Sequence, residues 1–294
     1  MRDVLRLGAL LACVALATSR FGLLAHELVG HGGTALAVGA HVVEVKLFWF
    51  AGGWIRNVGA PSTAAALAIA MGGIAVETVA GIGLQLVRGE TLGRRIVRGI
   101  GLALVLHASW YLATGAFSGF GDGVLLYREL GGARVPVAIA AALVTCTAGY
   151  LGAREALGAL AATQRRPIVG TALAVLLAAG LHAGLAVGEL QLRRDRTYAE
   201  TMAPERERQI TAELARWQAA HPQAAEPERT AAAHSIAEAH RPTFPFTIVL
   251  AIATLVAIVA GARRAKPGAG PITRRLLVTW AVAAAIAIAI VIAV

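Results

Sequence analysis

Charged side chains are scarce in this sequence. They make up 15% of its 294 residues, whereas a soluble domain averages about a quarter. Hydrophobic residues make up 57%, and the mean hydropathy is +0.67. This balance excludes an ordinary water-soluble domain and predicts a chain that is solvated by lipid.

Cysteine is also scarce. The chain has two cysteines, Cys13 and Cys146, and each lies inside an apolar run. A small scaffold stabilised by disulfides needs several cysteines at regular spacings, so the sequence excludes that class of protein.

Long apolar runs, by contrast, are abundant. The hydrocarbon core of a bilayer requires about 20 apolar residues per helix, and seven runs come close to this length or exceed it. We therefore predict an all-α polytopic membrane protein with about seven transmembrane helices. The runs cover residues 4–38, 61–87, 96–117, 135–153, 169–192, 245–262 and 276–294.

The first run permits two interpretations. Arg2 and Arg6 precede an apolar stretch that ends in small residues at 17–19, as in a cleaved signal peptide. The apolar character resumes directly afterwards, at 21–25. We therefore favour one long, uncleaved helix over residues 4–38.

The formal net charge of +10 would suit a protein that binds nucleic acid. The basic residues, however, are divided among short segments on alternate sides of the apolar runs, as in the cytoplasmic loops of membrane proteins. They therefore predict contact with anionic lipid and not with nucleic acid. We expect an integral protein of a bacterial-type inner or plasma membrane, with a cytoplasmic N-terminus. The basic segments are Arg2 with Arg6, 88–98, 154–166 and 263–275.

Two segments interrupt the apolar pattern. Residues 41–56 are rich in valine and aromatic residues around a glycine pair at 52–53, which predicts a β-hairpin at the membrane surface. Residues 193–243 mix glutamate with arginine, which predicts a polar helical insert on the outer side. We therefore divide the chain into a core of three helices and the hairpin (1–131), two helices (132–192), the insert (193–243) and two C-terminal helices (244–294).

Three ionisable side chains lie near the end of the first run, in the string His26-Glu27-x-x-x-His31. Such groups are costly in lipid unless they are paired or bind a ligand, so they are candidates for a functional site. Two histidines one helical turn apart, with a glutamate beside the first, are typical of zinc metalloproteases. This pattern predicts that His26 and His31 bind Zn²⁺ and that Glu27 is a catalytic general base.

The spacing of the two histidines departs from that pattern, because five positions separate them and not four. At about 100° per residue, five positions rotate the second imidazole to about 140° from the first on an ideal helix. A π-bulge, which adds one residue to a turn, would return both rings to one face. Alternatively, the helix can loosen at Gly30, where no side chain opposes a distorted backbone.

The order of these features resembles the site-2 protease family of intramembrane zinc metalloproteases. That family has a His-Glu-x-Gly-His string in its first conserved membrane helix, and residues 24–33 have this string with one residue inserted. A membrane-embedded hairpin follows in the family, as at 41–56. A glycine-rich helix comes next, and residues 71–77 are similar to it but lack its proline. The resemblance covers roughly residues 4–131.

The resemblance also implies a third metal ligand, in an Asp-Gly pair that the third helix brings to the site. Asp122-Gly123 is the counterpart here, and His107 and His41 are alternative ligands. Glu77 in the second helix either orients a ligand histidine or makes an interhelical hydrogen bond.

We expect a membrane-embedded zinc metallopeptidase that hydrolyses peptide bonds of membrane-anchored polypeptides, with Glu27 activating the water. The hairpin is expected to hold the substrate extended. Two alternatives stay open. One is a non-peptidase membrane protein, a transporter or scaffold, that binds metal without hydrolysis. The other is a metallohydrolase of lipid-linked substrates. The sequence indicates no oligomeric state.

Overall fold

The computed structural model describes residues 2–119, 121–164, 166–193, 197–239, 244–264 and 270–294. Seven helical segments within these ranges are long and apolar enough to cross a membrane, which confirms the predicted all-α polytopic fold. The chain is therefore an integral membrane protein. The spans after the first are α3 (Thr63–Leu84), α4 (Leu92–Ser118), the α6–α7 segment (Arg134–Ala161), α8 (Pro167–Leu192), α11 (Phe244–Arg263) and α12 (Arg274–Ala293).

The first span is continuous, as predicted for residues 4–38. It consists of α1 (Arg2–Leu24), the π-helix η1 (Ala25–Gly32) and the short helix α2 (Gly33–Ala37). α1 packs along α8 and α12, while η1 packs against α3. The wider turn of η1 is the first of the two distortions that the histidine spacing requires, so the predicted π-bulge is confirmed.

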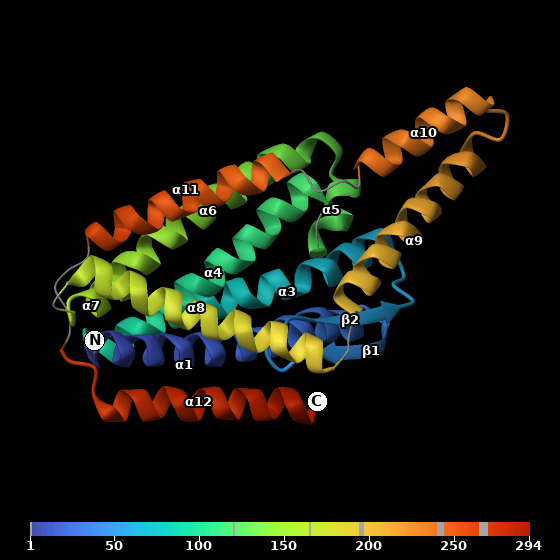
Figure 1. The fold of residues 1–294 in the computed structure, drawn as a ribbon. Helices are drawn as coiled ribbons and strands as arrows, with labels where there is room; N and C mark the ends of the chain where they lie inside the picture. The colour runs from blue at the N-terminus through green and yellow to red at the C-terminus, as the bar shows by residue number, and fades with distance from the viewer. Residues whose placement is uncertain (1, 120, 165, 194–196, 240–243, 265–269) are drawn as a thin grey trace.

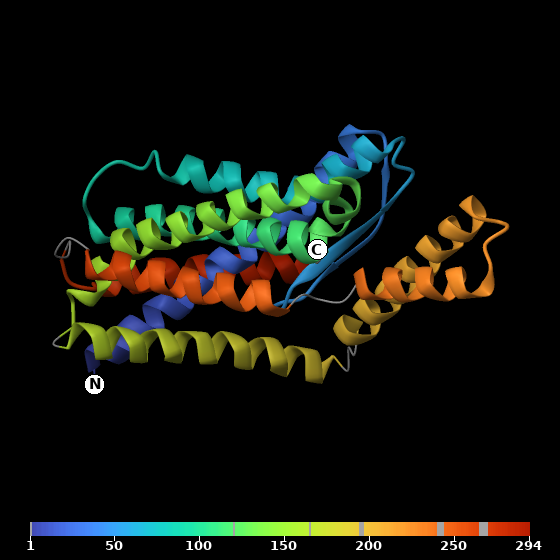
Figure 2. The ribbon, with the colours of Figure 1, turned by 90° about the horizontal axis from the view of Figure 1, so that it is seen from above.

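Successive spans run in opposite directions, so the molecule has two distinct ends (Figure 1). The N-terminus, α7 (Gly158–Ala161) and the start of α12 lie at one end. The hairpin and the short helix α5 (Val124–Glu129) lie at the other, together with two helices that extend beyond the spans (Figure 2). These two helices are α9 (Thr197–Ala220) and α10 (Glu226–Ala239), and they match the helical insert; the insert residues 194–196 and 240–243 lie outside the described ranges.

Two parts of the predicted loop structure are wrong. Arg94, Arg95 and Arg98 lie in the first turns of α4 and not in a loop, since α4 already begins at Leu92. The fourth span continues through a second π-helix, η4 (Ala153–Leu157), where a loop was expected. The reason is charge pairing: Glu155 of η4 accepts hydrogen bonds from the Arg98 side chain, which allows both charges to stay inside helices.

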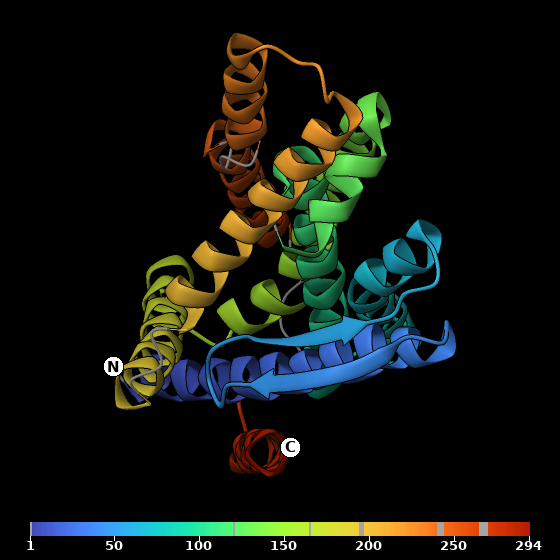
Figure 3. The same cartoon turned by 90° about the vertical axis from the view of Figure 1, so that its right-hand side faces the viewer.

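The predicted hairpin is present, with different bounds. β1 (His41–Leu47) pairs antiparallel with β2 (Gly53–Val58), so the second strand extends two residues beyond the predicted end. Phe48, Trp49 and Phe50 had the composition of a strand, but they form the turn instead. Figure 3 shows the hairpin lying across the end of α1, with α9 and α10 above it.

Two buried charged side chains from different spans hold this turn in place. Arg20 of α1 donates hydrogen bonds to the backbone oxygens of Phe48 (2.8 Å) and Ala51 (2.6 Å). The carboxylate of Glu189, near the end of α8, accepts from the backbone N–H groups of Trp49 and Phe50, both at 2.6 Å. The backbone groups of the turn therefore form hydrogen bonds with the Arg20 and Glu189 side chains and not with a neighbouring strand. This explains why its apolar residues are not part of the sheet.

We predict that Glu189→Ala frees the hairpin turn. The substitution leaves buried N–H groups without an acceptor and Arg20 without a nearby anion, a loss on the order of 3–5 kcal/mol. Hydrogen exchange of the Trp49 and Phe50 amides should become much faster. The matched control is Glu44→Ala on β1, which removes an exposed ion pair with Arg56 and should change exchange at the turn little. Unchanged protection at the turn in Glu189→Ala would contradict this role of Glu189.

Candidate metal centre

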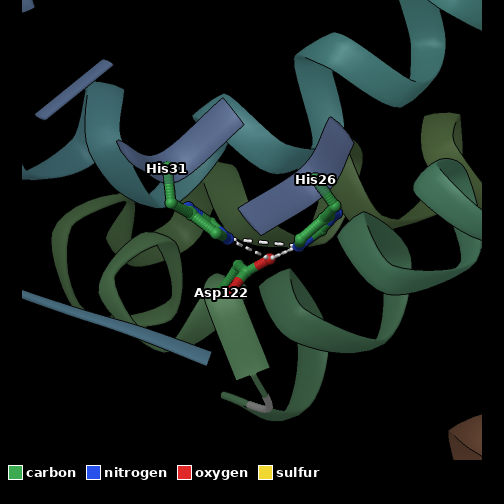
Figure 4. A group of neighbouring side chains, drawn as sticks. All are labelled: His26, His31 and Asp122. Carbon is green, nitrogen blue, oxygen red and sulfur yellow. Dashed lines mark hydrogen bonds and ion pairs between the residues drawn. The ribbon is translucent and has the colours of Figure 1, made fainter. Parts of the chain in front are cut away.

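Three potential ligand atoms converge at the end of the first span (Figure 4). The Nε2 atoms of His26 and His31 lie 3.1 Å apart. Oδ2 of Asp122 lies 2.9 Å from the first and 3.3 Å from the second. Ligand atoms about 2.1 Å from one tetrahedral ion lie about 3.4 Å from one another, so a single small cation fits this triangle with little adjustment. The structure thus brings His26, His31 and Asp122 together in a group that could hold a metal ion.

The π-helix η1 explains how the two histidines meet despite their spacing. A wider turn needs more than four residues to return to the same face, so five positions bring the rings together where an α-helix would separate them. Both rings face the same point, with an angle of 78° between their planes. The predicted metal-binding pair is therefore geometrically possible through the backbone of Ala25–Gly32.

Close backbone contact with α3 supports this unusual turn. A Cβ atom on Gly30 would lie 2.5 Å from the Cα atom of Gly73, and one on Gly73 would lie 2.5 Å from the His26 ring. Gly72 is equally tight against the carbonyl of Gly30. The glycine-rich second span thus allows the two helices to meet at their backbones.

Each histidine has a second contact that sets its orientation. Nδ1 of His31 donates to the backbone oxygen of Ile69 at 2.7 Å. Nδ1 of His26 lies 3.6 Å from a carboxylate oxygen of Glu77, whose other oxygen accepts from His107 at 2.8 Å. Such contacts fix the tautomer of a metal-binding histidine and hold its ring in place. The bond between Glu77 and His107 joins α3 to α4, which confirms the interhelical hydrogen bond, one of the two predicted roles of Glu77. The other oxygen of Glu77 lies near the His26 ring, at a distance longer than a hydrogen bond.

Asp122 reaches the histidines through a turn rich in glycine. The chain leaves α4 at Gly119, in the left-handed conformation (φ +65°), and Gly121 is also left-handed (φ +55°). Gly123 then packs against the backbone of Gly115, where a Cβ atom would collide. Gly119 and Gly121 favour glycine because of their positive φ, and Gly123 because of its close approach to the backbone of α4.

The chemistry of the three groups favours a cation between them. Because the carbonyl of Ile69 only accepts, the His31 ring hydrogen belongs on Nδ1, and its neutral Nε2 carries a lone pair. The carboxylate of Glu77, 3.6 Å from Nδ1 of His26, favours the same tautomer in that ring. Two such nitrogens and a carboxylate oxygen repel one another unless a metal ion or protons lie among them. Where protons take the place of the cation, the ring N–H groups donate to Asp122 and lower the pKa of its carboxyl to about 2, against the effect of burial, which raises it.

Glu27 and the three candidate ligands line one end of a cavity of about 1200 Å³. Glu27, His26 and His31 are 6–7% exposed, so the site is largely shielded from water. Residues of β2, among them Trp54 and Ile55, line the same end. A potential general base, a potential metal site and residues of one strand therefore line the same chamber.

The alternative ligands are placed elsewhere. His41 begins β1 on the exposed side of the hairpin and does not join the group, because the strand carries it away from η1. His107 bonds Glu77 and stacks on Tyr111 instead of facing the triangle. Arg20 and Glu189, which position the hairpin, did not figure in the sequence interpretation. The rule that singled out His26 applies to them too, because both are charged residues inside apolar runs.

Comparison of the chain with protein-family models, with curated proteins and with solved structures finds no match. The resemblance to site-2 proteases therefore stays a prediction that rests on the order of motifs along the chain.

We predict that Gly30→Ala disrupts the metal centre. The new methyl group collides with the Gly73 backbone, and separating η1 from α3 should cost about 1–3 kcal/mol and lower metal affinity. Gly33→Ala is the matched control, since the nearest atom to a Cβ there lies 3.8 Å away. Thermal unfolding and zinc titration of both variants test this. Equal zinc affinity in the two would show that the close contact is dispensable.

We also predict that Glu77→Gln weakens metal binding about 10- to 100-fold, because the neutral amide holds His26 less firmly than a carboxylate does. Competition with a chelator of known affinity measures the change. Glu90→Gln, at a carboxylate that is 82% exposed, is the control. If Glu77→Gln binds zinc as tightly as Glu90→Gln does, Glu77 does not contribute to metal binding.

Proposed function

We propose that this protein is a membrane-embedded zinc hydrolase that cleaves peptide bonds of membrane-anchored polypeptides. The observation that supports this most is the convergence of His26, His31 and Asp122 beside Glu27, at the end of a large cavity. His26, Glu27 and His31 are buried in the first span, where such side chains are costly unless they serve a function.

Zinc is the metal that best suits this donor set. Two imidazole nitrogens and one carboxylate oxygen form the protein part of many catalytic zinc sites, with the fourth position left for water or substrate. When bound, zinc lowers the pKa of a water molecule toward neutrality and polarises a carbonyl group. His26, His31 and Asp122 would hold it, and Ile69 and Glu77 would orient the two rings.

Glu27 is the proposed catalytic base. It follows His26 directly in η1 and lines the same cavity. Its carboxylate would accept a proton from the attacking water and deliver that proton to the leaving amine, so the residue is regenerated in each cycle. Burial of Glu27, which is 6% exposed, strengthens these electrostatic interactions.

The hairpin supports a polypeptide as the substrate. A two-stranded sheet presents open edges, and an extended peptide can add to such an edge through backbone hydrogen bonds. β2 lines the cavity near the candidate ligands. The Arg20 and Glu189 contacts hold the turn of this sheet, so the edge has a defined position relative to η1.

Two alternatives make different predictions. A metal transporter or scaffold would use the same ligands without needing Glu27. A hydrolase of lipid-linked substrates would keep Glu27 and is favoured by the apolar part of the cavity. Conversion of a membrane polypeptide or of a lipid-linked amide by purified protein separates the two hydrolases.

The charge distribution supports an orientation. Arg6 of α1, Arg263 of α11 and Arg274 of α12 lie at the end that bears the N-terminus. By the excess of positive charge in cytoplasmic loops, we place this end in the cytoplasm of a bacterial-type cell and the insert outside. The candidate metal centre then lies toward the outer face.

We predict that Glu27→Gln keeps zinc at the wild-type level and loses hydrolysis by about 10²- to 10⁴-fold, because the amide cannot accept the proton. Elemental analysis and a peptide-release assay on the same preparation measure both. His31→Ala should lose zinc as well as activity. Wild-type turnover in Glu27→Gln, or zinc retained in His31→Ala, would contradict the proposed function.

A further inference from the structure

The cavity that contains the candidate metal centre extends far beyond it. Along the first span, its lining continues from His31 of η1 down to Leu10 of α1. Leu10 precedes His26 by 16 positions, which corresponds to about 24 Å of helix at about 1.5 Å per residue. The chamber therefore reaches most of the way across a hydrocarbon core of about 30 Å.

The two ends of this chamber differ in polarity. Polar lining residues gather at the metal end, among them Glu77, His107 and Asn57, and polar groups continue down α1 as far as Thr18. From Thr18 to the far end, all lining side chains in the described part of the chain are apolar. Val14, Ala15, Ile100, Ala103 and Leu157 are examples.

The far end of the chamber is closed. Leu10, Ile96 and Leu160 line it and belong to a buried cluster with exposures of 0%, 3% and 2%. This floor is contributed by α1, α4 and α7. A ligand that enters from the metal end must therefore terminate inside the hydrocarbon region.

A transmembrane helix cannot terminate there. Its last four carbonyl groups have no partner within the helix, and lipid offers none, so a spanning helix must reach water at both ends. An aliphatic chain has no such requirement and ends in a methyl group. The closed floor thus favours an aliphatic chain over a transmembrane helix as the membrane anchor of the ligand.

We propose that the chamber binds the aliphatic chain of a lipid-anchored substrate, with the chain end at the floor and its polar linkage at the candidate metal centre. The inference rests on the proposed function only for the position of the scissile bond. An extended chain advances about 1.3 Å per carbon, from C–C bonds of about 1.5 Å. The depth of about 24 Å then accommodates about 18 carbons.

The test uses N-acyl dipeptides with chains of 10 to 22 carbons, some with a photoreactive diazirine near the chain end, added to full-length Glu27→Gln protein in micelles. Lipid and micelle interiors are as apolar as the chamber, so each added carbon should gain little affinity. The expected signature is a length limit: affinity should fall about tenfold or more once the chain exceeds about 18 carbons, since further methylenes overpack the floor. The diazirine of the C18 probe should label Val14, Ile100 or Leu160.

Two substitutions shorten the chamber. Ala15 lies 11 positions before His26, or about 17 Å, so Ala15→Phe should lower the limit to about 13 carbons. Ala103→Phe narrows the chamber from the opposite wall, nearer the metal centre, and should lower the limit further; it also serves if the first variant folds poorly. Ala9→Phe is the matched control, because Ala9 is exposed on the same helix and does not line the cavity.

The outcomes separate this inference from the proposed function. One outcome is labelling inside the chamber, with a length limit that Ala15→Phe shortens, in a protein that has neither zinc nor hydrolytic activity. This result would support the chain site and contradict the proposed function. Labelling confined to the lipid-facing surfaces of α11 or α12, or a limit that Ala15→Phe leaves unchanged, would overturn the chain site even in an active zinc enzyme. Labelling of the floor by a transmembrane peptide with the same diazirine would also overturn it.

Discussion

The backbone contact between η1 and α3 is the interaction on which the rest of the site depends. Two histidines five positions apart point to different faces of an α-helix, and here they meet because the helix widens into a π-helix, a form that is rare in proteins. This form is stabilised by direct contact between Gly30, Gly72 and Gly73 and by the bond from His31 to the carbonyl of Ile69. The same contact places Gly73 against the His26 ring and brings Glu77 to its far nitrogen. The five-residue spacing of the histidines, the glycines of the two helices and the positions of the ligand atoms therefore depend on one another.

The hairpin and the chamber depend on the same first span. Arg20, six positions before His26, binds the hairpin turn, and Glu189 of α8 completes its hydrogen bonds. The position of the sheet is thus set by charged groups in the membrane-spanning helices and not by its own two strands, which would be marginal alone. Below it, α1 and α4 enclose an apolar chamber with polar groups at one end. A substrate with a polar end and an apolar chain fits a chamber of this polarity.

Much of the fold follows from the sequence, because lipid allows few alternatives. Run length fixes the spans, and the position of the hairpin follows from its valine and aromatic content. The π-helix was one of two distortions derived from counting positions between His26 and His31. Other features depend on partners distant in sequence. The turn at 48–52 requires Glu189, and η4 requires Arg98. The exclusion of His41 from the site follows from the direction of β1, which local composition does not determine.

We propose that His26, His31 and Asp122 bind one metal ion. X-ray absorption spectroscopy of purified protein loaded with zinc tests this most directly. We expect one zinc per chain, with imidazole nitrogen and carboxylate oxygen at about 2.0–2.2 Å. The imidazole contribution should fall from two rings toward one in His31→Ala, together with most of the bound zinc. Zinc bound without histidine, or an unchanged spectrum and stoichiometry in His31→Ala, would contradict it.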